Sequence, residues 1–163
     1  MLFYIILKMN HYYNTVKVLP NELNIHLDNI ILDKLKDKIG DKCDKNGFIK
    51  KESINIISKS KPKIIPAHFD GSLYYRLEYN ADVINPNIND LIDCVIIKKN
   101  KHGILAKEDC IYVVIPYIFN GINNEETLNK LFVNDKIQIK IIGKDYDIND
   151  TQINVHGDYI KKY

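Results

Sequence analysis

The sequence predicts an α+β fold, in which one main helix packs on a small antiparallel sheet and a five-stranded β-barrel follows. Three observations support this prediction: one long amphipathic segment early in the chain, short apolar runs elsewhere, and a break at Asn85-Pro86-Asn87. We therefore expect two domains, residues 1–85 with the helix and residues 86–163 with the barrel.

The helix is expected to run from Glu22 to Ile39, with Asn21 as its cap and Gly40 as its end. Leucine or isoleucine stands at every fourth position from residue 23 to residue 39, which gives the segment one apolar face. A helix with such a face packs against another element.

The other apolar runs are short and predict strands. Residues 1–9 are too few to span a membrane, so we expect a first strand there. Further strands are expected at 48–49 and 54–57, and at 73–79, where apolar and polar residues alternate. Five runs then fit a small closed barrel of the OB type, at 91–98, 103–107, 111–118, 136–142 and 151–155, with a polar insertion at 120–126.

The composition limits the function classes. The net charge of +2 is too small for the whole surface to attract nucleic acid. Any contact with nucleic acid must therefore be made by a local basic patch. Three cysteines without paired spacing favour neither a disulfide framework nor a zinc site, and indicate a reducing compartment, so the chain is not expected to be secreted. A single arginine among many lysines, with abundant isoleucine and asparagine, is typical of an AT-rich genome.

Catalytic motifs are not found in the sequence. It has no G-x-S-x-G, no Walker A and no HExxH motif, and its five histidines are scattered. We expect no catalytic residues, no cofactor and no metal.

The segment from Asp44 to Ile49 resembles the middle of a calcium-binding loop, with Gly47 at its sharp turn. In that alignment Lys42 and Ser53 take the first and last ligand positions, where calcium needs carboxylates. We therefore interpret the segment as a structural turn before a strand.

A small basic patch is expected where the first barrel strand turns into the second. Its residues are Lys98, Lys99, Lys101 and His102, which offer cations for phosphate and a ring for base stacking. A solvated lysine turn fits these residues equally well. Tyr112 and Tyr117 are further candidate rings, but their odd spacing places them on opposite faces of a regular strand, so at most one joins the site.

The order of these segments resembles the family formed by the seventh subunit of RNA polymerase II and its archaeal counterpart. The resemblance covers nearly the whole chain and rests on the co-linear set of segments. They are Met1-Leu2-Phe3, Val18-Leu19-Pro20, the helix closing on Gly40, Lys45 to Ile49, Ile64-Ile65-Pro66, Asp70-Gly71-Ser72, Tyr75 to Tyr79, Ile84-Asn85-Pro86, His102-Gly103, Cys110 to Tyr117 and Ile137 to Gly143.

The resemblance implies an N-terminal tip domain followed by an S1-type OB domain, in a non-catalytic stalk subunit of a DNA-directed RNA polymerase. Its partners would be the polymerase core subunits near the clamp, a small fourth-subunit-like stalk protein, and weakly bound nascent single-stranded RNA, with no membrane contact. The docking loop would be Asp44, Lys45, Asn46, Gly47 and Phe48, with Phe48 as an exposed apolar anchor. The location would be the nucleus for a cellular protein, and the host cytoplasm or virion for a large DNA virus.

The sequence departs from the family at several positions. Better RNA-binding members of the S1 group carry rings at the positions of His102 and Leu105 and a histidine near that of Val114, and only the first is kept here. Each lost stack removes about 1–3 kcal/mol, so the implied RNA affinity is modest. Residues 10–14 are an apparent insertion after the first strand.

Two alternatives remain open. One is a free-standing OB-fold RNA-binding protein, such as a translation factor, although a lone barrel would not need residues 1–85. The other is the equivalent subunit of RNA polymerase I or III.

Overall fold

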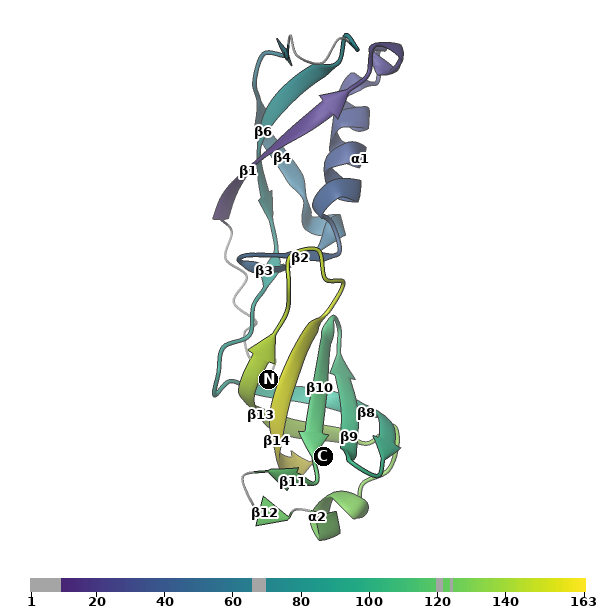
Figure 1. Ribbon diagram of the computed structural model, residues 1–163, viewed down its shortest axis with the longest axis vertical. Coiled ribbons are helices and arrows are strands. Elements are labelled where there is room, and N and C mark those ends of the chain that lie inside the picture. Colours follow the sequence, from purple (N-terminus) through teal and green to yellow (C-terminus); the bar gives the residue numbers. More distant parts are fainter. Residues whose placement is uncertain (1–9, 66–69, 120–121, 124) are drawn as a thin grey trace.

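The computed structural model describes residues 10–65, 70–119, 122–123 and 125–163. The strand predicted at residues 1–9 lies outside the described residues. Two regions follow each other along the long axis of the molecule, a helix-bearing sheet and a barrel (Figure 1).

The first region is an antiparallel sheet with one helix on one face. Its strand order is β1-β6-β4, where β1 is Asn10–Val18, β6 is Leu73–Ala81 and β4 is Asn55–Lys59; β5 (Lys63–Ile64) also pairs with β6. Helix α1 (Leu27–Ile39) buries Ile31 and Leu35 in a core that includes Val16, Leu77 and other residues of β1 and β6.

Two details of this region differ from the prediction. Helix α1 begins at Leu27, because Glu22 belongs to a 3-10 turn, η1 (Pro20–Glu22), in which its carboxylate accepts the N–H of Leu19. The predicted end at Ile39 is confirmed, since the N–H of Gly40 makes the last helical bond. Residues 10–14, where the sequence suggested an insertion after the first strand, are themselves part of a strand, since β1 pairs with β6 without interruption from Asn10 to Val18.

A small three-stranded sheet lies between the two regions. Its order is β2-β3-β7, where β2 is Lys42–Asp44, β3 is Gly47–Ile49 and β7 is Val83–Ile84. The 3-10 turn η2 (Lys51–Ser53) leads from β3 towards β4.

The second region is the predicted five-strand barrel. The strands are β8 (Leu91–Asn100), β9 (Gly103–Glu108), β10 (Ile111–Pro116), β13 (Lys136–Asp145) and β14 (Ile153–Lys162), closed in the order β10-β14-β13-β8-β9. The β10–β14 pairing is parallel and the others are antiparallel, as an OB-type barrel requires. The last strand is longer than predicted.

Three short elements lie between β10 and β13: β11 (Ile118–Phe119), β12 (Ile122–Asn123) and helix α2 (Glu125–Asn129). Alternate residues of β10 and β13 point into a barrel core dominated by isoleucine. No helix in the described ranges is long and apolar enough to cross a membrane.

The two regions share a packed junction. Cys43, Phe48 and Ile84, from the small sheet, belong to the hydrophobic core of the barrel. Main-chain bonds cross the same junction, because the N–H of Cys43 donates to the carbonyl of Asp150 at 2.7 Å and Asn149 donates to the carbonyl of Cys43 at 2.8 Å. The small sheet therefore connects the barrel to the rest of the chain by side-chain and main-chain contacts.

Candidate functional site

The predicted docking loop is the hairpin that joins β2 to β3. The Asp44 carboxylate accepts hydrogen bonds from the main chain and side chain of Asn46, at 2.6 and 3.0 Å. The amide of Asn85 donates to the carbonyl of Asn46 at 2.7 Å. This geometry agrees with the interpretation of the segment as a turn before a strand, because its polar groups fix a two-residue hairpin.

Phe48 is not the exposed anchor that the sequence predicted. Its ring is only 7% exposed and packs in the barrel core, because main-chain bonds of Cys43 to Asn149 and Asp150 hold the hairpin against the barrel. Lys45 is the exposed residue at the tip of the hairpin, with Asp44 and Asn46 half-buried beside it. A docking role therefore remains a prediction for the polar tip, while Phe48 holds the hairpin on the barrel.

The predicted basic patch lies at the turn between β8 and β9. Lys98, Lys101 and His102 are exposed there, and the side-chain oxygen of Asn100 accepts the N–H groups of His102 and Gly103. The turn thus presents two cations and one ring to solvent.

Lys99 has a different environment from its neighbours. Its ammonium group donates to three carbonyls at the end of α2, those of Leu128, Asn129 and Leu131, at 3.1, 2.8 and 3.2 Å. A lysine that caps a helix end in this way stabilises the structure, so Lys99 contributes to holding α2 on the barrel.

Only one of the two candidate tyrosines is accessible. Tyr112 lies half-exposed on the outer face of β10, and the Lys107 ammonium lies 5.0 Å from the centre of its ring. Tyr117 is 7% exposed within the barrel core, so its ring cannot stack on a base in this structure.

The barrel places further polar side chains beside these residues. One row across the outer face runs through Lys98, Leu105, Val114 and His156, which are paired in register on β8, β9, β10 and β14. Lys107 and Tyr112 form part of the next row. We name the set Lys98, Lys101, His102, Lys107, Tyr112 and His156 the outer barrel face.

Sequence reasoning missed Lys107 and His156. Lys107 alternates with buried Ala106 and so was detectable as an outward residue of its strand. His156 joins the set through the parallel pairing of β10 with β14, which connects residues about forty positions apart and leaves no local signal in the sequence.

The described residues contain no group of three His, Cys, Asp or Glu side chains that could hold a metal ion. Cations and rings on a strand surface can bind phosphates and bases.

Comparison with known proteins finds one viral protein that is similar to this chain over most of the chain's length. The chain is 30% identical over 146 residues to a protein of Acanthamoeba polyphaga mimivirus that is named, provisionally, as a DNA-directed RNA polymerase subunit. The alignment covers 90% of this chain, and therefore most of both regions, and the chain spans 66% of the length of that relative. No family model matches the chain.

Proposed function

We propose that this chain is a non-catalytic stalk subunit of a multisubunit DNA-directed RNA polymerase, of the seventh-subunit type. The observation that carries the proposal is the similarity to a protein named as a polymerase subunit, which extends over the helix-bearing region and the barrel. In this proposal residues 1–85 form the tip domain and residues 86–163 the S1-type OB domain. The viral relative supports a location in the host cytoplasm or virion.

The tip of the β2–β3 hairpin is the proposed contact with the polymerase core. Asp44, Lys45 and Asn46 suit this role because the hairpin is fixed by its own hydrogen bonds and by Asn85. A preformed loop loses little conformational entropy on binding. A small stalk partner would pack on the same subunit.

Co-purification tests the polymerase role. We expect the tagged chain to bring down the large polymerase subunits from a native extract of its source, as identified by mass spectrometry. Lys45→Glu should reduce their yield, whereas Lys61→Glu, a charge reversal at another exposed lysine, should not. Recovery of the chain with ribosomal or other RNA-bound proteins, and without polymerase, would favour a free-standing RNA-binding protein.

The outer barrel face is the proposed contact with nascent RNA. Lysines that neutralise phosphates make affinity fall with salt, by a slope of about 0.7 per contact for single strands. Replacing Lys98, Lys101 and Lys107 with glutamine should therefore lower the slope by about 2. Tyr112→Ala or His102→Ala should instead weaken binding with the slope nearly unchanged, because stacking depends little on salt.

Fluorescence anisotropy with a single-stranded RNA over a salt series measures both quantities. Lys61, Lys63 and Lys140, replaced together by glutamine, provide a control of equal charge change at exposed positions outside the set named the outer barrel face. Lys99 is kept in all variants, because its loss would disturb α2. The same affinity and slope in every variant would show that this face does not bind RNA.

A further inference from the structure

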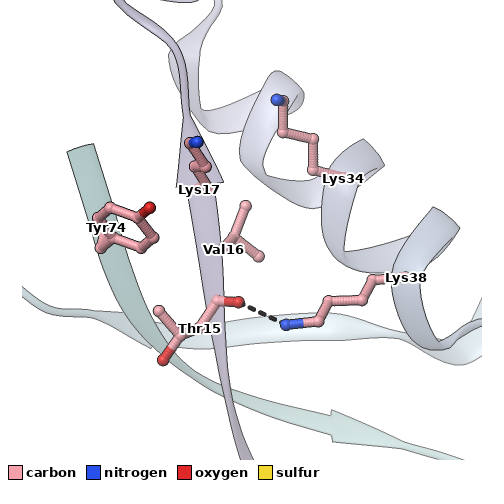
Figure 2. A pocket seen from close by; sticks show the side chains of 6 residues that line it. All are labelled: Thr15, Val16, Lys17, Lys34, Lys38 and Tyr74. Carbon is pink, nitrogen blue, oxygen red and sulfur yellow. Dashed lines mark hydrogen bonds between the residues drawn. The ribbon is translucent and has the colours of Figure 1, made fainter. Parts of the chain in front are cut away.

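The edge of β1 and the neighbouring helix α1 border a basic groove (Figure 2). Its volume is about 470 Å³. The lysines come from both sides, Lys17 from β1 and Lys34 and Lys38 from α1. The other lining residues are Thr15, Val16 and Tyr74.

The ion pairs that two of these lysines form can be replaced by pairs with a bound ligand. Lys17 pairs with Asp70 at 2.6 Å and Lys34 pairs with Glu22 at 2.7 Å, and all four side chains are partly exposed. Such exposed pairs contribute little to stability, because solvent screens them. Three ammonium groups around one groove therefore favour an occupant that carries several negative charges.

The strand edge in the groove offers main-chain groups. Within the described residues β1 pairs with β6 alone. On the other edge, the N–H of Thr15 donates to the side chain of Asn14 and its carbonyl accepts the Lys38 ammonium, both at 2.8 Å. Main-chain groups alternate in direction along an antiparallel strand, so those of Tyr13 and Lys17 also point away from β6.

Asn14 and Lys38 thus stand where the acceptor and donor of a neighbouring strand would stand. Lys38 is exposed, Asn14 is half-buried, and the Lys38 ammonium also donates to the side-chain oxygen of Asn14 at 2.8 Å. An added strand would replace the bonds of Thr15 to these two side chains with main-chain bonds of its own. Single-stranded nucleic acid has no alternating amide and carbonyl groups with which to complete such an edge, whereas a peptide does.

We propose that this groove binds an extended acidic segment of a partner protein. The segment adds to β1 as a further strand and places carboxylates near Lys17, Lys34 and Lys38. Main-chain bonds to β1 supply affinity and the lysines select for acidic side chains. This inference rests on the groove alone and does not depend on the polymerase role.

The first test uses two synthetic peptides with the full-length protein. One is a fluorescent peptide of about ten residues with alternating glutamate and threonine, long enough to follow β1. The other has the same sequence with every backbone nitrogen methylated, which keeps the charge and removes every N–H. The first should bind and the second should bind at least about tenfold more weakly. Equal binding of the two peptides would overturn strand addition, as would no binding of either.

The second test changes the protein. Thr15→Pro removes an N–H that points away from β6 and should abolish binding of the glutamate–threonine peptide, while Thr15→Val should retain it. Circular dichroism checks that each variant is folded, and if Thr15→Pro does not fold, the comparison of the two peptides still decides. Retained binding to a folded Thr15→Pro variant would contradict the proposal.

A third test addresses charge. Replacing Lys17, Lys34 and Lys38 with glutamine should weaken peptide binding about tenfold. The matched replacement of Lys61, Lys130 and Lys140 should leave it unchanged. A single-stranded oligouridine that displaced the peptide and bound more tightly would make the groove a general polyanion site and overturn the assignment to a peptide.

Discussion

Gly47 determines how closely the hairpin approaches β7. Its φ of 132° lies where side chains other than glycine are strained, and a Cβ at this position would be 2.4 Å from the carbonyl oxygen of Ile84. The contact is with main chain, which cannot rotate away as a side chain could. The hairpin therefore needs glycine for its backbone angle and for space.

Gly47→Ala should lower the free energy of unfolding by about 1–3 kcal/mol, because the strained angle and the close contact both oppose the native state. Urea denaturation measures the change. Gly143→Ala is the matched control, since the nearest atom to its Cβ would be the His156 ring at 4.0 Å. Equal stability of the two variants would contradict this account of the hairpin.

At the scale of elements, the β2–β3 hairpin connects the two regions through Cys43. Burial raises the pKa of this thiol to about 11, and it raises the pKa of Cys94 and Cys110 to about 12. All three thiols are buried and protonated at neutral pH. Their reaction with alkylating reagents therefore requires that the structure opens.

The rate of alkylation should report this opening. We expect the native protein to resist iodoacetamide at pH 8, because thiolate is the reactive form and is scarce at three units or more below the pKa. Lys144→Ala should increase the labelling of Cys43 in particular, since the Lys144 ammonium bonds to the side chain of Asn85 and, at 2.9 Å, to the carbonyl of Pro86, both next to the hairpin.

Mass spectrometry of tryptic peptides separates the three cysteines. Lys140→Ala, which removes an exposed lysine from the same strand, is the control. Rapid labelling of Cys43 in the wild-type protein would show that the hairpin does not stay packed on the barrel.

The sequence predicted elements well where one local pattern decided the structure. The alternation in Leu73–Tyr79 predicted β6, and five apolar runs predicted the barrel strands, because each such pattern fits only one backbone period. The helix start was wrong because the four-residue spacing of apolar residues continues back to Leu23, while Glu22 is held in the preceding turn.

The sites were harder to predict than the strands. Phe48 was expected to be an exposed anchor, and Tyr117 was one of two candidate rings of which at most one could join the site. Both rings are buried by residues distant in sequence. Lys99 has the same local sequence environment as Lys98, and only the position of α2 distinguishes their roles. Burial and partners of this kind depend on tertiary packing, which a local pattern does not contain.

At the scale of the whole molecule, the two hydrophobic cores are coupled by the small sheet. Ile49 and Val83 belong to the core under α1, while their neighbours Phe48 and Ile84 belong to the core of the barrel. Alternate residues of β3 and β7 thus point into different cores. Unfolding of the barrel would expose the face of the small sheet that carries Phe48 and Ile84. Unfolding of the first region would expose the opposite face, which carries Ile49 and Val83.

We therefore expect the two regions to unfold together, in one cooperative transition. Phe48→Ala should lower the free energy of unfolding by about 3–5 kcal/mol, as for other buried rings. Because the cores are coupled, Phe48→Ala should reduce the protection of main-chain amides from hydrogen exchange in β6 as well as in β13. Hydrogen exchange followed by mass spectrometry measures both strands in one sample.

Phe132→Ala is the control, because that ring is 69% exposed and its loss should change protection little. If Phe48→Ala reduced protection in the barrel alone and β6 kept its wild-type rate, the regions would be independent folding units, and the small sheet would be a spacer between them.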